Sequence, residues 1–175
     1  MSGFAEPLRL NAIRSGDRLH FVATDEERED IADRLGLVAL DRFEAEVTLE
    51  RNGELVTATG RVTAKAAQPC IATGEPVHET VDEPVTLRFV PVPGDGDPDE
   101  EIELDANELD TVFHDGQVID LGDALADTLS LALDPYPRSP NAEEVLRDAG
   151  VLSEEEAGPF SGLAALKEAM QKKGG

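Results

Sequence analysis

The alternation of apolar and polar residues is clearest from residue 42 onward. Every second position is apolar, namely Phe43, Ala45, Val47 and Leu49, and the positions between them are polar. This period of two predicts a strand with one buried face. Asn52-Gly53 predicts a type I′ turn, after which residues 55–62 return as the partner strand. With a further strand over residues 79–90, the pattern predicts an antiparallel sheet across residues 42–90.

Shorter apolar runs precede this sheet. Residues 7–10 and 19–23 have the composition of strands and are separated by the turn-forming Ser15-Gly16-Asp17. We therefore expect two early strands.

The spacing of apolar residues changes to a helical one after residue 24. Thr24 and Glu27 match a capping box, in which each side chain accepts a hydrogen bond from the other residue's backbone N–H. Ile31, Leu35 and Val38 recur at intervals of three or four residues. These signals predict a helix over about residues 25–35, and Gly36 is suited to end it.

A leucine stripe marks a second helix. It follows a short predicted strand at Val118-Ile119 and repeats every four residues at Leu121, Leu125, Leu129 and Leu133. Such a stripe needs an apolar surface to cover it, which the preceding sheet supplies. Prolines at 135, 137 and 140 end the helix. Beyond them we expect a linker with a short helix at residues 142–148 and an amphipathic helix over residues 161–173.

These elements predict an α+β fold: an antiparallel, hairpin-rich sheet packed by two or three helices, with an acidic loop. The loop is expected at about residues 93–101, where glycine, proline and like charges interrupt every period. We expect residues 1–137 to form a single domain. Residues 138–175 would then be a linker and a C-terminal amphipathic helix.

The charge is large and unevenly distributed. The net charge is −23, and residues 91–175 hold 21 acidic residues against five Lys and Arg. Affinity for nucleic acid grows when cationic side chains meet phosphates, so this half of the chain is built to repel RNA and favours a basic partner. The plain alternative is that the charge serves solubility alone. Direct RNA binding would need the arginines Arg9, Arg14, Arg18, Arg28 and Arg34 to gather on one face, and they read more simply as ordinary surface charges.

No apolar run approaches the length of a membrane span, and no basic, apolar leader opens the chain. The one cysteine, Cys70, excludes an internal disulfide. We therefore expect a cytoplasmic protein that does not associate with membranes.

The stretch around Cys70 raises the question of metal or redox chemistry. A structural zinc site needs four ligands, but Cys70 is the only thiol and the histidines His20, His78 and His114 are scattered. Local acids would raise the thiol pKa, which suits buried packing better than catalysis. Asp95, Asp97 and Asp99 start a calcium-loop pattern that fails at Glu100 and Ala106. No nucleophile elbow or phosphate-binding loop occurs either, so we expect no metal, no cofactor and no enzymatic activity.

Several short stretches, in this order, resemble the YceD family of bacterial large ribosomal RNA subunit accumulation proteins. They are residues 23–28 (ATDEER), 34–37 (RLGL), 60–64 (GRVTA), Pro69-Cys70, residues 75–77 (EPV), residues 116–121 (GQVIDL) and residues 129–133 (LSLAL). The resemblance spans about residues 6–137. It singles out Cys70, Thr73, Pro76, Gly116, Asp120 and Leu121 as family-like structural residues. Many relatives have a second cysteine where this chain has Thr73, which argues against a shared metal or redox role for the turn.

The resemblance implies a non-enzymatic ribosome biogenesis factor that supports accumulation or processing of large-subunit ribosomal RNA. Joined to the charge pattern, it predicts binding to a basic ribosomal protein or a large-subunit precursor particle rather than to naked RNA. The predicted partner-binding residues are Glu100, Glu101, Glu103, Asp105, Glu108, Asp110, Asp115, Asp120 and Asp123. The alternatives are a metal-dependent nuclease that processes RNA, and an acidic nucleic-acid mimic that occupies an RNA-binding protein.

Overall fold

The structure is a computed structural model that describes Phe4, residues 6–92 and residues 110–151. The predicted acidic loop, the five site residues from Glu100 to Glu108 and the predicted helix over 161–173 lie outside the described residues. In chain order the elements are β1 (Leu8–Arg9), η1 (Leu10–Ala12), β2 (Asp17–Val22), α1 (Asp25–Leu35), β3 (Ala39–Asn52), β4 (Leu55–Pro69), β5 (Pro76–Pro91), β6 (Thr111–His114), β7 (Val118–Ile119), α2 (Leu121–Ala132) and α3 (Ala142–Asp148).

The chain divides into two compact units. The first consists of Met1–Gln68 with His78–Pro135, and the second of Pro69–Val77 with Tyr136–Gly175. This division differs from the predicted domain boundary at residue 137, because the turn between β4 and β5 groups with the C-terminal part. That residues 1–137 fold as an independent domain stays a prediction.

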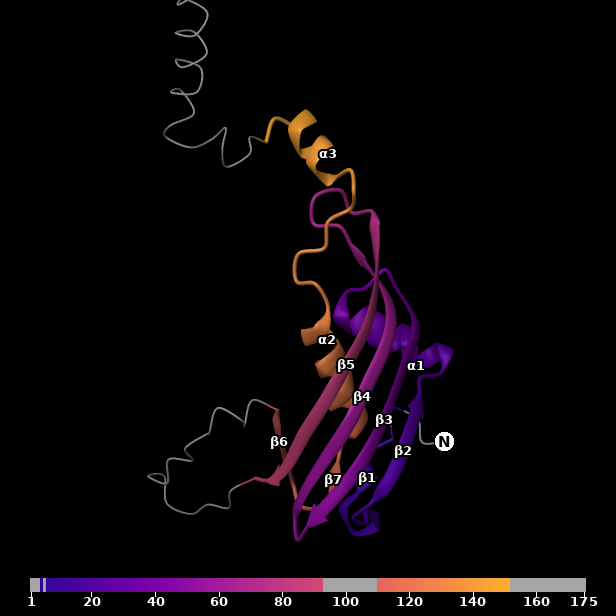
Figure 1. Ribbon diagram of the computed structural model, residues 1–175, viewed down its shortest axis with the longest axis vertical. Coiled ribbons are helices and arrows are strands. Elements are labelled where there is room, and N and C mark those ends of the chain that lie inside the picture. Colours follow the sequence, from indigo (N-terminus) through magenta and orange to yellow (C-terminus); the bar gives the residue numbers. More distant parts are fainter. Residues whose placement is uncertain (1–3, 5, 93–109, 152–175) are drawn as a thin grey trace, which may run out of the picture. The chain divides into compact units, whose positions relative to one another are not determined.

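A five-stranded sheet forms the centre of the first unit, in the order β2-β3-β4-β5-β6 (Figure 1). The pairs β2–β3 and β3–β4 are antiparallel, while the β5–β6 pair is parallel. A second sheet pairs β1 with β7, joining Leu8 to Ile119. The predicted α+β fold is confirmed, whereas β6 and its parallel pairing were not predicted.

The core lies on one face of the five-stranded sheet. Phe21, Phe43 and Phe89 project from three strands and are at most 1% exposed. They share one apolar cluster with Leu125 and Leu129 of α2, so α2 covers this face. In Figure 1 both α1 and α2 lie behind the sheet, which leaves its other face open. The predicted leucine stripe is therefore confirmed as the packing surface of α2.

The β3–β4 hairpin is confirmed, but its turn differs from the prediction. Asn52 pairs with Leu55, so the loop residues are Gly53 and Glu54 rather than Asn52 and Gly53. Gly53 has a φ of +66°, and no non-glycine residue among those described has a positive φ. A type I′ turn needs positive φ at both loop residues, whereas type II′ needs it only at the first. The type I′ assignment was wrong because the ladder extends one residue further than the sequence pattern indicated.

Helix α1 begins and ends where the sequence predicts. Thr24 is its N-cap and Gly36, with a φ of +66°, is its C-cap. Val38, in contrast, lies beyond the helix and is 53% exposed, so its helical spacing was coincidental. The short helix α3 matches its predicted range in the second unit.

Candidate functional site

A groove lies between α1 and the start of α2. It has a volume of about 270 Å³. Both helices and the N-terminal segment contribute to its lining, which consists of Phe4, Glu27, Asp30, Ile31, Arg34, Asp120, Gly122, Asp123 and Ala126. Four carboxylates thus surround a floor that is partly apolar, with a single guanidinium at the groove.

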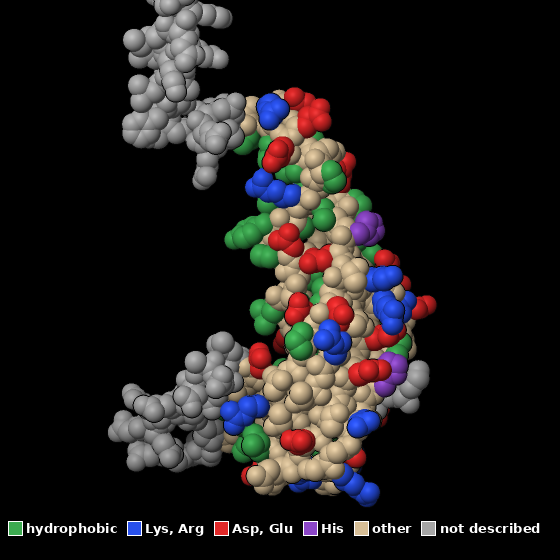
Figure 2. All heavy atoms as spheres, in the orientation of Figure 1, with side chains coloured by type: hydrophobic (Ala, Val, Ile, Leu, Met, Phe, Trp, Pro, Cys, Tyr) green, Lys and Arg blue, Asp and Glu red, His purple; other side chains and the backbone are tan. Residues whose placement is uncertain are grey.

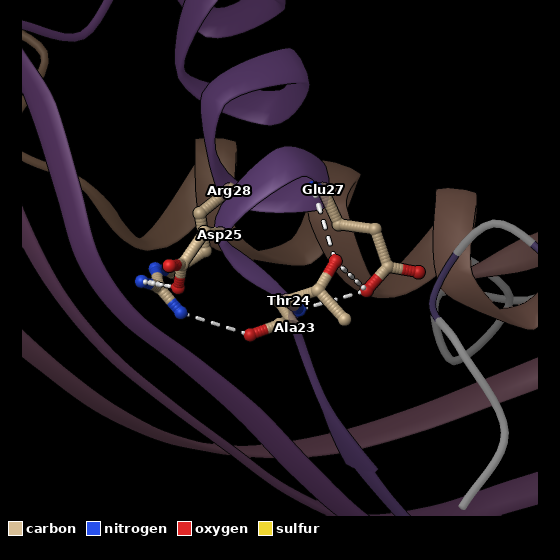
Figure 3. A network of polar contacts seen from close by, with 5 residues as sticks. All are labelled: Ala23, Thr24, Asp25, Glu27 and Arg28. Atoms are coloured by element: carbon tan, nitrogen blue, oxygen red, sulfur yellow. Dashed lines mark hydrogen bonds and ion pairs between the residues drawn. The ribbon is translucent and has the colours of Figure 1, made fainter.

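The capping box at the start of α1 holds Glu27 in place (Figure 3). The Thr24 N–H donates to Glu27 Oε2 at 2.8 Å, and the Glu27 N–H donates to Thr24 Oγ1 at 3.3 Å. Arg28 adds bonds to the Ala23 carbonyl at 3.0 Å and to Asp25 Oδ1 at 2.7 Å. Because the Thr24–Glu27 bonds satisfy free N–H groups at the start of the helix, the local sequence fixes the orientation of Glu27 on α1.

The start of α2 forms the opposite wall. Asp120 is the N-cap, and its Oδ1 accepts the Asp123 N–H at 2.9 Å. Gly122 allows the N-terminal segment to approach closely, since a Cβ at this position would lie 1.6 Å from the Phe4 carbonyl oxygen. The Phe4 ring stacks on Phe43 with ring centroids 4.3 Å apart. The groove therefore has a floor anchored in the core.

Arg34 joins the two helices across the groove. Its guanidinium donates to Asp123 and, at 3.4 Å, to Asp127. All three side chains are substantially exposed, so these ion pairs contribute little stability, at most about 1 kcal/mol each. One arginine against the carboxylates of Glu27, Asp30, Asp120 and Asp123, with Asp127 beside them, leaves the site strongly anionic. Chemically, it can receive cationic side chains.

The structure brings together only part of the predicted acidic surface. Asp120 and Asp123 line the groove, whereas Asp110 and Asp115 flank β6. Asp115 has a local role, because its Oδ1 accepts the N–H groups of Gln117 at 2.8 Å and Val118 at 3.2 Å. Those two hydrogen bonds lower the pKa of the Asp115 carboxyl below its ordinary value. Asp115 thus stabilises the turn that leads into β7.

Sequence reasoning missed the α1 wall of the groove. Glu27 was recognised only as a capping residue, Arg34 only as a surface charge, and Asp30 was not singled out. The acidic composition of residues 25–33 was a visible signal, but the pairing of α1 with α2 is a long-range contact. Gly116 and Leu121 have structural explanations: Gly116 has a φ of +84° and Leu121 is 1% exposed.

The β6–β7 turn is fixed by a buried histidine. His114 Nδ1 accepts the Gly116 N–H at 3.0 Å, so Nε2 bears the proton that bonds the Glu54 carbonyl at 2.9 Å. His114 is 5% exposed and links this turn to the β3–β4 hairpin. His114 therefore has a structural role, and it does not line the acidic groove.

Cys70 lies in a polar nest within the second unit. Its Sγ accepts the Ser139 N–H at 3.2 Å and the Ser139 hydroxyl at 3.4 Å, and the residue is 3% exposed. Burial raises the pKa of the thiol, but hydrogen bonds from Ser139, Thr73 and Ala72 outweigh it and lower the pKa to about 6. The expectation that local acids raise this pKa was therefore wrong.

The turn around Cys70 is closed by its own backbone. Cys70 N–H donates to the Glu75 carbonyl and Gly74 N–H to the Cys70 carbonyl, both at 2.8 Å. Thr73 Oγ1 lies 3.2 Å from Ser139 Oγ. Pro76 follows as the first residue of β5. Within the described part of the chain, no three metal-ligating side chains gather, here or elsewhere.

The fold and the groove define an α+β protein with an acidic groove between two helices. The family model described as "Large ribosomal RNA subunit accumulation protein YceD" matches residues 58–167, which is more than half of the chain. The chain therefore belongs to the YceD family, a bacterial family with a role in the accumulation of large-subunit ribosomal RNA. The matched range includes α2 and leaves α1 outside.

The family description names an accumulation factor rather than an enzyme, and it implies interactions related to the ribosome. No curated protein and no solved structure matches the chain. Among the described residues, no helix has the length and apolar character needed to cross a membrane.

Proposed function

We propose that this protein supports large-subunit ribosomal RNA accumulation by binding a basic ribosomal protein or precursor particle through its acidic surface. The observation that carries the proposal is the groove between α1 and α2, where carboxylates of two helices converge around one arginine. Family membership supplies the ribosomal context, and charge complementarity supplies the chemistry of the partner. The protein acts as a non-enzymatic adaptor in the cytoplasm.

The groove suits a lysine or arginine of the partner. The aliphatic part of such a side chain can pack on Phe4, Ile31 and Ala126, while its charged end meets the surrounding carboxylates. Acidic residues 100–108 extend the same charge along the sequence. Because charge acts mainly on the rate of encounter, association should be fast and should weaken as salt increases.

The test is quantitative capture of large-subunit ribosomal proteins and precursor RNA by the tagged full chain. The variant neutralises two groove acids and the neighbouring Asp127 without touching a cap: Asp30→Asn, Asp123→Asn and Asp127→Asn. Each lost exposed pair is worth roughly 0.5 kcal/mol, so the triple variant should weaken binding about tenfold. The wild-type complex should also dissociate steeply between about 50 and 300 mM salt.

The matched control changes three acids away from the groove: Asp41→Asn, Glu50→Gln and Glu83→Gln. It alters the net charge equally and should leave capture within about twofold of the wild type. Equal weakening by both variants would mean that overall charge, not the groove, governs binding, and would refute the proposal. Shortening of precursor RNA by the purified protein with magnesium would favour a nuclease instead.

A further inference from the structure

The face of the sheet opposite the helices differs from the other described residues in its balance of cationic and acidic side chains. Register places His20, Glu46 and Arg61 in one row across β2, β3 and β4, all on the face opposite Phe21, Ala45 and Val62. Arg42 and Lys65 form another row. Threonines fill much of the remaining surface, at positions 48, 57, 59, 63, 80 and 86. We call this surface the open face.

Cationic residues are concentrated on the open face. It has five Lys and Arg against four Asp and Glu, whereas the other described residues have seven against 22. The five cations are Arg18, Arg42, Arg61, Lys65 and Arg88, and the four acids are Glu44, Glu46, Glu50 and Asp82. Figure 2, in which the sheet faces the viewer, shows blue and red side chains scattered over this face among tan atoms. The open face is thus the side of the described structure that repels an anion least.

A shallow hollow of about 620 Å³ crosses the middle of the open face. Arg18 and His20 of β2 line one side, Glu46 and Thr48 of β3 lie between, and Thr59 and Arg61 of β4 line the other. Two of the nearby acids are already paired, since Arg42 bonds Glu44 at 2.6 Å and Arg61 bonds Asp82. Guanidinium groups and hydroxyls are the side chains that most often contact phosphate and ribose oxygens.

An exposed aromatic ring lies at one end of this face. Phe113 of β6 pairs with Val90 of β5, and both lie opposite the core-facing Phe89 and Val112. Phe113 is 51% exposed, which is unusual for a phenylalanine in a sheet. Arg88 is two residues from Val90 on the same side of β5. An exposed ring near a cation on a sheet surface is an arrangement on which an unpaired base can stack while a phosphate is held nearby.

We propose that the open face contacts single-stranded RNA, with phosphates along Arg18, Arg61 and Lys65 and a base on Phe113. The four acids of the face keep this contact weak for the isolated protein. In the adaptor described above, a partner held at the acidic groove raises the local concentration of RNA at the opposite side of the sheet. The two faces would then bind the protein and the RNA of one precursor particle.

The test uses the full chain and a fluorescent 20-nucleotide oligouridine at about 20 mM salt, where phosphate contacts are strongest. Binding is followed by anisotropy, and 254-nm cross-links are mapped by mass spectrometry. The double variant Arg18→Glu/Lys65→Glu should reduce affinity about tenfold. Phe113→Ala should reduce affinity about fivefold and remove a cross-link to β6, because stacking on one ring is worth roughly that factor or more.

The control Arg14→Glu/Arg147→Glu changes net charge equally at exposed positions off the open face, and it should change affinity less than twofold. Circular dichroism checks that all variants remain folded. Equal losses in both double variants, no binding, or cross-links confined to α1 and α2 would overturn the inference, as would unchanged binding by Phe113→Ala. None of these outcomes touches the capture of a basic partner, so the two proposals fail separately.

Discussion

Gly60 of β4 lies close to the backbone of β3, its neighbour in the middle of the sheet. A Cβ added to Gly60 would lie 1.9 Å from the Glu46 carbonyl oxygen and 2.7 Å from Val47 Cα. Both obstacles belong to backbone, so no side-chain rotation can relieve them. The perturbation is Gly60→Ala, which adds one methyl group and changes no charge.

The magnitude follows from the distances. Real Cβ atoms essentially never approach within 3.0 Å, so the alanine variant must separate the strands by at least 1.1 Å at this point. Forced packing of this kind costs about 1–3 kcal/mol, and the reduced freedom of the unfolded chain returns about 0.4–1 kcal/mol. Because every close atom belongs to the β3 backbone, we expect the upper part of this range, a net loss of about 2 kcal/mol and a melting temperature lowered by roughly 4–8 °C.

Urea unfolding followed by circular dichroism measures the free energy of unfolding directly. The matched control is Thr59→Val, an isosteric change at the exposed neighbouring position, which should lie within about 0.5 kcal/mol of the wild type. A Gly60→Ala variant as stable as that control would show that the strands separate freely, and the reasoning from close approach would be refuted.

Three further outcomes follow from other parts of the fold. Leu125→Ala should cost about 2–5 kcal/mol in urea unfolding, because Leu125 is fully buried under the sheet; a loss below 1 kcal/mol would contradict this packing. Thr24→Ala should cost about 0.5–2 kcal/mol by removing the capping box, and Thr24→Ser should restore most of it; equal losses in both would assign the effect elsewhere. Absorbance at 240 nm should titrate the Cys70 thiolate near pH 6, and Ser139→Ala should move that midpoint toward 9. Since the folded pKa is below the unfolded one, the unfolded state binds more protons between about pH 6 and 9. The contribution of Cys70 to the free energy of unfolding should therefore rise with pH between about 6 and 9, be fully present above pH 9 and be lost as pH falls through 6. Cys70→Ala should abolish this pH dependence, and a dependence that persists would assign it to another group.

Local elements could be predicted because their causes are local. The capping box of α1, its glycine C-cap and the leucine stripe of α2 lie within a few residues of the structure that they specify. The β3–β4 hairpin was predicted from its period, yet its turn was shifted by one residue, since register depends on the whole ladder. Strand β6 escaped prediction because four residues show no period, and it forms by pairing with β5.

The negative charge of the candidate site could be predicted from the sequence, but the groove in which it lies could not. Composition by itself determined that the protein is acidic, and short-range patterns determined most helices and strands. Only the tertiary structure decided that Glu27 and Asp30 face Asp120 and Asp123 across a groove, and that cations collect on the opposite side of the sheet. It also surrounded Cys70 with donors from Ser139, 69 positions away, and so reversed the direction of its pKa shift. The physical reason is that charge and period are sums over neighbouring residues, whereas a groove, a face and a hydrogen-bonded thiol arise from contacts between distant ones.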